Sequence, residues 1–159
     1  MNCLLVIGYG NTLRGDDAAG PRVAEAIENL HLPNVETITC QQLSPEHADP
    51  VSRADCVIFV DAEVNITEVQ LRPLEPSQSS QLLAHNADPR TVLALARDVF
   101  GHAPSAWWLT IPAVALEFSE SLSHVTQQAF AVAVGRILTV RDTSSPSPRP
   151  NGFPNPPPV

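Results

Sequence analysis

Residues 8–17 of this chain read Gly-Tyr-Gly-Asn-Thr-Leu-Arg-Gly-Asp-Asp, a glycine-rich stretch that ends in two aspartates. It follows the apolar run 3–7 and precedes a helix-like segment that begins near Pro21. A strand, a glycine turn and a helix start in this order are typical of α/β domains, in which they often cradle a phosphate. Here the turn ends in two adjacent carboxylates. These would repel a phosphate, but they suit a metal cation or a proton-transfer reaction.

The composition indicates a single soluble acidic domain. The chain has 159 residues, of which 43% are hydrophobic, and a formal net charge of −8. This charge argues against nucleic acid or an anionic membrane as a partner, because both need a cationic surface. All nine basic residues are arginine, which excludes a Schiff-base lysine and a P-loop lysine. No targeting segment and no apolar run of about 20 residues is found, so we expect a cytoplasmic monomer.

The three cysteines indicate neither a disulfide framework nor a zinc site. Cys3, Cys40 and Cys56 are odd in number and show no CxxC spacing. We expect them to be small buried residues of a protein in a reducing compartment. A cysteine nucleophile has no supporting motif.

Strand and helix patterns alternate along the chain and predict a three-layer α/β/α domain. Only residues 62–67 separate the third and fourth strands, which is too short for a parallel crossover, so strand 4 should run antiparallel to strand 3 in a mixed sheet. Residues 1–140 form the predicted domain, and residues 141–159 form a proline-rich tail that we expect to be disordered. The predicted strands are 3–7, 35–40, 56–60, 68–71 and 106–111, and the helices are 21–30, a short one after Ser44, 88–100 and 123–140.

Acidic residues follow two of these strands at the edge where α/β domains bind ligands. Asp16 and Asp17 lie in the loop after strand 1, and Asp61 comes directly after strand 3. Carboxylates and an imidazole suit a divalent transition ion, and His85 is the leading histidine because it lies in a polar segment just before a helix. Each residue also has a structural interpretation: Asp17 as a helix-dipole partner, Asp61 as a strand terminator and His85 as a solvated loop residue.

Other histidines and other motifs give weaker hypotheses. Among the remaining histidines, His47 and His102 are predicted to lie on the surface. A dinucleotide fingerprint fits Gly8 and Gly10 but has Leu13 at its third glycine position. A degenerate nucleotide-binding domain is therefore the weakest alternative. Asp16 is interpreted first as a hydrogen-bonding turn residue, although a role in proton transfer stays open.

These motifs together resemble the hydrogenase maturation endopeptidases, which process the large subunit of nickel-iron hydrogenases. The opening motif, residues 8–21, carries most of the resemblance. Val60-Asp61-Ala62, His85 and Leu122-Ser123 follow in the family's order. The resemblance covers residues 1–140 and implies a sandwich around a five-stranded mixed sheet.

The resemblance also implies a function. Asp17, Asp61 and His85 would contact nickel that the precursor supplies, with no organic cofactor. Asp17 and Asp61, with Asp16 as a third candidate, would serve an aspartyl-type endopeptidase that removes the precursor's C-terminal extension after nickel insertion. Peptide hydrolysis would proceed in one of two ways: a metal polarises the scissile carbonyl, or a carboxylate acts as general base. A non-catalytic metal-sensing chaperone of the same precursor is the alternative.

The predicted substrate loop departs from the family pattern. Many members have an Asp-Gly-Gly-Thr loop after the second strand, whereas this chain reads Cys40-Gln41-Gln42-Leu43. This is more similar to the His-Gln-Leu variant of maturases for soluble, NAD-linked hydrogenases, with Gln41 in place of the histidine. We expect Gly10, Asn11, Gln42 and Leu43 to contact the substrate.

Overall fold

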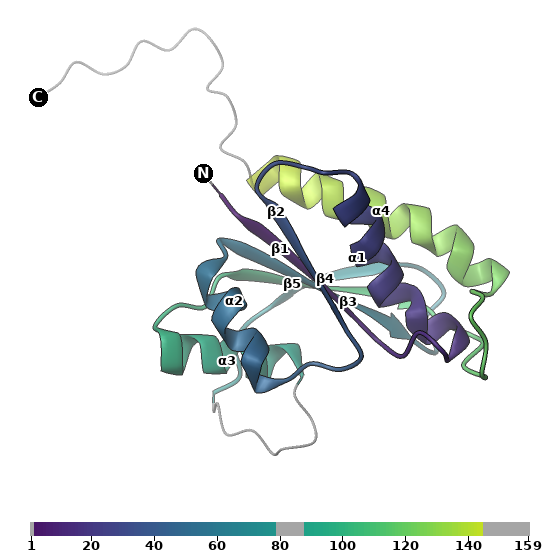
Figure 1. Ribbon diagram of the computed structural model, residues 1–159, viewed down its shortest axis with the longest axis horizontal. Coiled ribbons are helices and arrows are strands. Elements are labelled where there is room, and N and C mark those ends of the chain that lie inside the picture. The colour runs from purple at the N-terminus through teal and green to yellow at the C-terminus, as the bar shows by residue number, and fades with distance from the viewer. Residues whose placement is uncertain (1, 79–87, 145–159) are drawn as a thin grey trace, which may run out of the picture.

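The computed structural model describes residues 2–78 and 88–144 and contains one five-stranded mixed sheet between two helical layers (Figure 1). The strand order is β2-β1-β3-β5-β4, with β4 antiparallel to β5 and the other pairs parallel. The predicted fold class is therefore confirmed. The strands are β1 (Leu4–Tyr9), β2 (Val35–Cys40), β3 (Cys56–Glu63), β4 (Gln70–Leu74) and β5 (Ser105–Pro112), and the helices are α1 (Ala19–Asn29), α2 (Ala48–Arg53), α3 (Pro89–Phe100) and α4 (His124–Ser144), with short 3-10 helices η1 (Gly15–Ala18) and η2 (Pro45–His47).

Two separate apolar cores lie on the two faces of the sheet. Helices α1 and α4 cover one face, and α2 and α3 cover the other (Figure 1). Alternation along β1 feeds both cores, because Leu4 and Val6 point toward α1 while Leu5 and Ile7 point toward α2. No helix of the described residues is long and apolar enough to cross a membrane.

Side-chain caps start two of the helices where the sequence predicts them. Asp88 Oδ1 accepts a hydrogen bond of 2.9 Å from the Thr91 amide at the start of α3. Ser123 Oγ accepts one of 3.3 Å from the Thr126 amide at the start of α4. These caps satisfy amides that the helices leave without an internal partner.

Several local predictions need correction. Strand β3 continues to Glu63 because β5 offers hydrogen-bonding partners as far as Pro112, so Asp61 lies inside β3 and not after it. β4 runs antiparallel to β3 as predicted, but β5 lies between them and β4 forms an edge of the sheet. Helix α4 continues to Ser144, four residues into the predicted tail, and residues 145–159 lie outside the described residues.

His47 is buried, contrary to the prediction that it lies on the surface. Its Nδ1 accepts a 3.0 Å hydrogen bond from the Ser44 amide and forms a capping box at η2. The ring is turned inward because it completes this cap.

Close approach of α1 to the sheet depends on glycine. A Cβ at Gly20 would lie 2.5 Å from the Val60 carbonyl oxygen and 2.6 Å from that of Tyr9. Gly8, on β1, meets the backbone of Gly20 directly across this contact. The start of α1 therefore rests on the carboxyl ends of β1 and β3, and any side chain here would push it away.

We predict opposite effects for two glycine-to-alanine substitutions. Gly20→Ala should lower the free energy of unfolding by about 2–3 kcal/mol, because its Cβ meets rigid backbone atoms. Gly135→Ala, in α4, should raise it by about 0.5–1 kcal/mol, because a Cβ there meets nothing within 4 Å. Urea unfolding followed by circular dichroism measures both. Equal effects of the two substitutions would contradict the close packing of α1.

Candidate functional site

The candidate site lies where the chain reverses its direction of winding across the sheet. From β1 the chain crosses one face through α1 to β2, and it then returns across the other face through α2 to β3. The carboxyl ends of β1 and β3 therefore meet at a topological switch point, which is where open α/β sheets bind ligands. Asp17, in η1, and Asp61, in β3, both lie at this point.

Asp17 is held by the loop that precedes it. Its Oδ2 accepts a 2.7 Å hydrogen bond from the Asn11 amide. Gly10 adopts a φ of 148°, and a Cβ on it would lie 2.0 Å from the Asp17 carbonyl oxygen. The glycine turn thus folds back tightly on Asp17 and fixes its carboxylate.

Asp61 is close enough to Asp17 for the two carboxylates to interact. Burial raises the pKa of Asp61 to about 6, a hydrogen bond from Tyr9 opposes this shift, and the charge of Asp17 adds to it. The pKa of Tyr9 is itself raised, first by burial and then by the charge of Asp61. Tyr9 therefore remains a neutral hydroxyl that donates to Asp61, and the structure brings Asp17 and Asp61 together as the sequence predicts.

Two polar atoms of β5 lie near this pair with unused hydrogen-bonding capacity. Thr110 is aligned with Asp61 in the register of β3 and β5, and Trp108 lies two residues before it on the same face. Thr110 Oγ1 and Trp108 Nε1 are buried and have no hydrogen-bond partner among the described residues. The indole lies near enough to Tyr9 to lower the pKa of that phenol, but it misses hydrogen-bond geometry.

The sequence analysis missed Tyr9, Trp108 and Thr110. The sequence contains part of the information needed to find these residues, because side chains two residues apart on a strand lie on the same face of the sheet. Tyr9 follows Ile7 by two positions, and Thr110 follows Trp108 in the same way. What the sequence lacks is the pairing of β3 with β5, which brings Thr110 beside Asp61.

Asp16 has a different environment from its neighbour Asp17. Its side chain is fully buried and accepts hydrogen bonds from the amides of Val114, Ala115 and Ser123, at 2.9, 2.8 and 2.7 Å, and from the Ser123 hydroxyl at 2.8 Å. Burial alone would raise its pKa, but these four hydrogen bonds outweigh burial and lower the pKa to about 2. These contacts favour the interpretation of Asp16 as a structural carboxylate.

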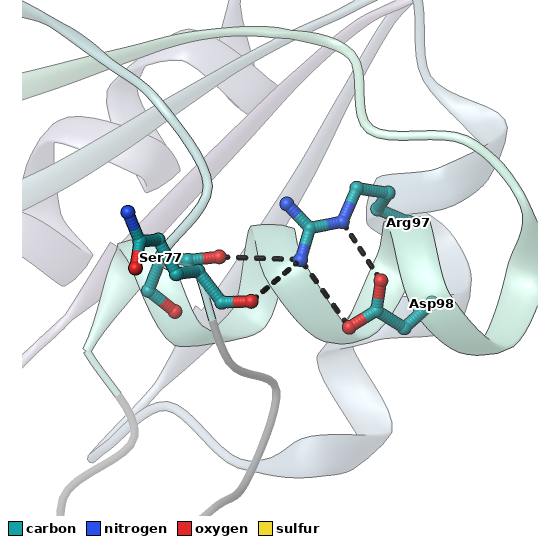
Figure 2. Close-up of polar contacts among 4 residues, drawn as sticks. Ser77, Arg97 and Asp98 are labelled. Carbon is teal, nitrogen blue, oxygen red and sulfur yellow. Dashed lines mark hydrogen bonds and ion pairs between the residues drawn. The ribbon is translucent and has the colours of Figure 1, made fainter.

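His85 lies outside the described residues, but the chain on either side of its segment is anchored on α3. Arg97 donates hydrogen bonds to the carbonyls of Ser77 and Gln78, at 3.2 and 3.4 Å, while it pairs with Asp98 (Figure 2). On the other side, Asp88 caps α3 and lies close enough to Tyr9 for its charge to raise the pKa of that phenol. Gln78 and Asp88, the described residues that flank this segment, therefore both lie against α3, and Asp88 also lies near Tyr9.

The structure places only two of the four predicted substrate-contact residues at a common cavity. Gly10 and Asn11 line a cavity of about 370 Å³ at the carboxyl ends of β1 and β2, and Gln41 lines its other side. Gln42 is exposed but does not line this cavity, and Leu43 packs in the core between α2 and α3. The cavity adjoins Asp17 through Asn11, whose amide holds the Asp17 carboxylate.

The described part of the chain contains no metal cluster, and the cysteine that lines the cavity is not activated as a nucleophile. Residues 2–78 and 88–144 contain no group of three His, Cys, Asp or Glu that could hold a metal ion. No disulfide involves Cys3, Cys40 or Cys56, and Cys40 is the one that lines the cavity. Burial, with a contribution from the Glu46 charge, raises the pKa of Cys40 to about 11, so its thiol is protonated at neutral pH and is a poor nucleophile.

Several solved structures share the fold of this chain, although their sequences differ from it at most positions. The sequence matches no protein-family model, and no curated protein matches it. The hydrogenase maturating endopeptidase HybD from E. coli aligns with a TM-score of 0.70 and 22% identity, over 89% of this chain and 94% of that one. The [NiFe] hydrogenase maturation protease HycI from Thermococcus kodakarensis gives 0.69 and 23%, over 87% and 92%. A hydrogenase 2 maturation peptidase from a Thaumarchaeota archaeon gives 0.65 and 23%, over 88% and 98%. The chain therefore has the fold of the hydrogenase maturation endopeptidases.

We predict that Asp16 stabilises the fold in a pH-dependent way. Its pKa lies below that of an unfolded aspartate, so its stabilisation is complete above about pH 4 and is lost as the pH falls toward 2. A shift from 3.8 to about 2 corresponds to about 2 kcal/mol. Asp16→Asn should therefore lower the free energy of unfolding by at least about 2 kcal/mol at pH 7, with a smaller difference at pH 2.

Denaturant unfolding at pH 7, 4 and 2 measures this dependence. Asp49→Asn is the matched control, because Asp49 is exposed and makes only an i,i+4 ion pair with Arg53. A deficit of Asp16→Asn that stays constant from pH 7 to pH 2 would show that the ionised form of Asp16 is not what stabilises the fold.

Proposed function

We propose that this protein is an endopeptidase that removes the C-terminal extension of a nickel-iron hydrogenase large-subunit precursor after nickel insertion. One observation carries the proposal: Asp17 and Asp61 converge at the switch point of a fold shared with hydrogenase maturation endopeptidases. The opening motif of residues 8–21 supports it independently of the fold.

In this proposal, Asp17, Asp61 and His85 contact the nickel that the precursor carries. Carboxylate oxygens and an imidazole nitrogen suit a divalent transition ion. His85 lies three positions before Asp88 in the sequence, and Asp88 acts electrostatically on Tyr9 beside Asp61. This place in the sequence supports His85 as the third contact. Nickel enters as part of the substrate, and no organic cofactor is required.

Hydrolysis of the peptide bond needs one group to take a proton from water and a donor to protonate the leaving amine. We assign the proton transfers to the Asp17–Asp61 pair, since Asp61 is enclosed, next to a second carboxylate and oriented by the Tyr9 hydroxyl. Asp16 has no part in these transfers in our proposal, because four hydrogen bonds already engage its carboxylate. On this route nickel would serve for recognition. On the alternative route, nickel contacted by Asp17, Asp61 and His85 would polarise the scissile carbonyl.

The other functions considered from the sequence gain less support. A nucleotide-binding domain would place a phosphate against Asp17, whose carboxylate lies at the glycine turn. A cysteine protease would need a thiolate, which the environment of Cys40 disfavours. A metal-sensing chaperone would use the same surface as the endopeptidase, so experiment must separate those two.

The test is incubation of the protein with nickel-loaded and nickel-free large-subunit precursor, followed by intact mass measurement. We expect loss of a C-terminal peptide only from the nickel-loaded form. Binding of the precursor with no change of mass would establish the chaperone instead. Cleavage of both forms at equal rates would contradict the role of nickel.

Substitutions in the site should separate catalysis from folding. Asp17→Asn, Asp61→Asn and His85→Ala should each reduce the cleavage rate by at least about 100-fold, the range typical of lost acid–base groups, with the circular dichroism spectrum unchanged. Asp49→Asn, an exposed aspartate on α2, is the control and should cleave at the wild-type rate. A variant of the site that keeps wild-type cleavage would remove that residue from the mechanism.

A further inference from the structure

Three large apolar side chains project into solvent beside the candidate site. Phe118 is 83% exposed, Val114 is 64% exposed and Leu13 is 46% exposed. They come from two segments far apart in sequence, the glycine turn after β1 and the loop between β5 and α4. We refer to Leu13, Val114 and Phe118 as the apolar patch.

Backbone hydrogen bonds hold the two segments of the patch side by side. The Ser119 amide donates to the Leu13 carbonyl at 2.9 Å, and the Gly15 amide donates to the Ser119 carbonyl at 2.8 Å. The carboxylate of Asp16 accepts hydrogen bonds from the amides of Val114 and Ala115. Arg22, on α1, donates to the carbonyl of Glu120 and ties the same loop to the helix. The apolar side chains are therefore displayed on an ordered support.

An ordered apolar patch of this kind is suited to binding. Exposed apolar residues that are scattered singly need no explanation, but apolar side chains gathered on one ordered support favour an interaction site. Binding through this surface costs this protein less conformational entropy, because its loop is already fixed. Phe118 is the natural anchor, since aromatic side chains dominate the energy of many interfaces.

The position of the patch indicates what covers it. Leu13 belongs both to the patch and to the wall of the 370 Å³ cavity that contains Gly10 and Asn11. Asp17, which the Asn11 amide holds, adjoins this cavity. The patch, the cavity and the carboxylates therefore form one continuous surface. A small molecule at Asp17 would not reach Phe118, whereas a protein that brings a chain segment to Asp17 would cover it.

We propose that the apolar patch docks the folded body of the protein substrate, while the segment to be cut passes along the cavity to Asp17 and Asp61. This inference rests on the proposed endopeptidase function and adds where its substrate is held. The partner surface is apolar, with a side chain or pocket that receives Phe118. Recognition then depends on the folded substrate and not only on the sequence around the scissile bond.

The test compares Phe118→Ser and Val114→Ser with a matched control, Phe100→Ser. Phe100 is 48% exposed and ends α3, away from the patch. Binding of labelled nickel-loaded precursor is measured by fluorescence anisotropy, and KM and kcat are measured by intact mass. We expect Phe118→Ser to raise both Kd and KM at least tenfold with kcat within twofold of wild type, Val114→Ser to act in the same direction, and Phe100→Ser to change neither.

Wild-type Kd and KM for both patch variants would overturn the docking inference, even if the protein cleaves the precursor as proposed. Sedimentation velocity tests a second copy of this chain as the occupant. A wild-type dimer that Phe118→Ser converts to monomer, with precursor binding unchanged, would also overturn the inference. If the wild type binds the precursor through Phe118 but does not cleave it, docking is supported and the endopeptidase function fails. If the wild type does neither, both fail.

Discussion

The buried carboxylate of Asp16 is the interaction on which the rest of the site depends. It joins the turn after β1 to the loop after β5 and to the start of α4, which lie 98 to 107 residues later in the sequence. A buried charge without partners would be costly, but four donors surround this one. Because Asp17 is the next residue, the same network fixes the backbone from which the neighbouring carboxylate reaches the switch point. Of the two adjacent aspartates, Asp16 therefore holds the surrounding segments together, and Asp17 lies at the switch point.

Predictions that rest on local chemistry agree well with the structure. Asp88 and Ser123 cap helices, and each cap requires only a side-chain oxygen that accepts a hydrogen bond from the amide three residues later. The residues of β2 are those predicted from their alternation. The mixed sheet follows from the short connection after β3, which forbids a parallel crossover.

Predictions that depend on contacts between distant residues were less accurate. The length of β3, and with it the place of Asp61 inside a strand, is set by how far β5 extends beside it. The buried state of Asp16 depends on a loop almost 100 residues later. His47 is an exception, because the cap that it completes joins it to Ser44, only three residues before it. The sequence predicts the convergence of Asp17 and Asp61 because both lie toward the carboxyl ends of strands, whereas it does not predict the place of Leu43 in the core. His85 remains a prediction.

The position of β4 has a consequence for how this protein avoids unwanted assembly. An edge strand offers a row of free amides and carbonyls on which another chain can polymerise, and natural sheets interrupt that row with proline and charge. β4 contains Pro73, which has no amide hydrogen, and Arg72, which lies 5.2 Å from the centre of the Trp108 ring and pairs with Glu63 at 3.2 Å. This edge is therefore a poor template for strand addition. Partly folded chains are therefore less able to pair with this edge of the sheet and to form aggregates on it.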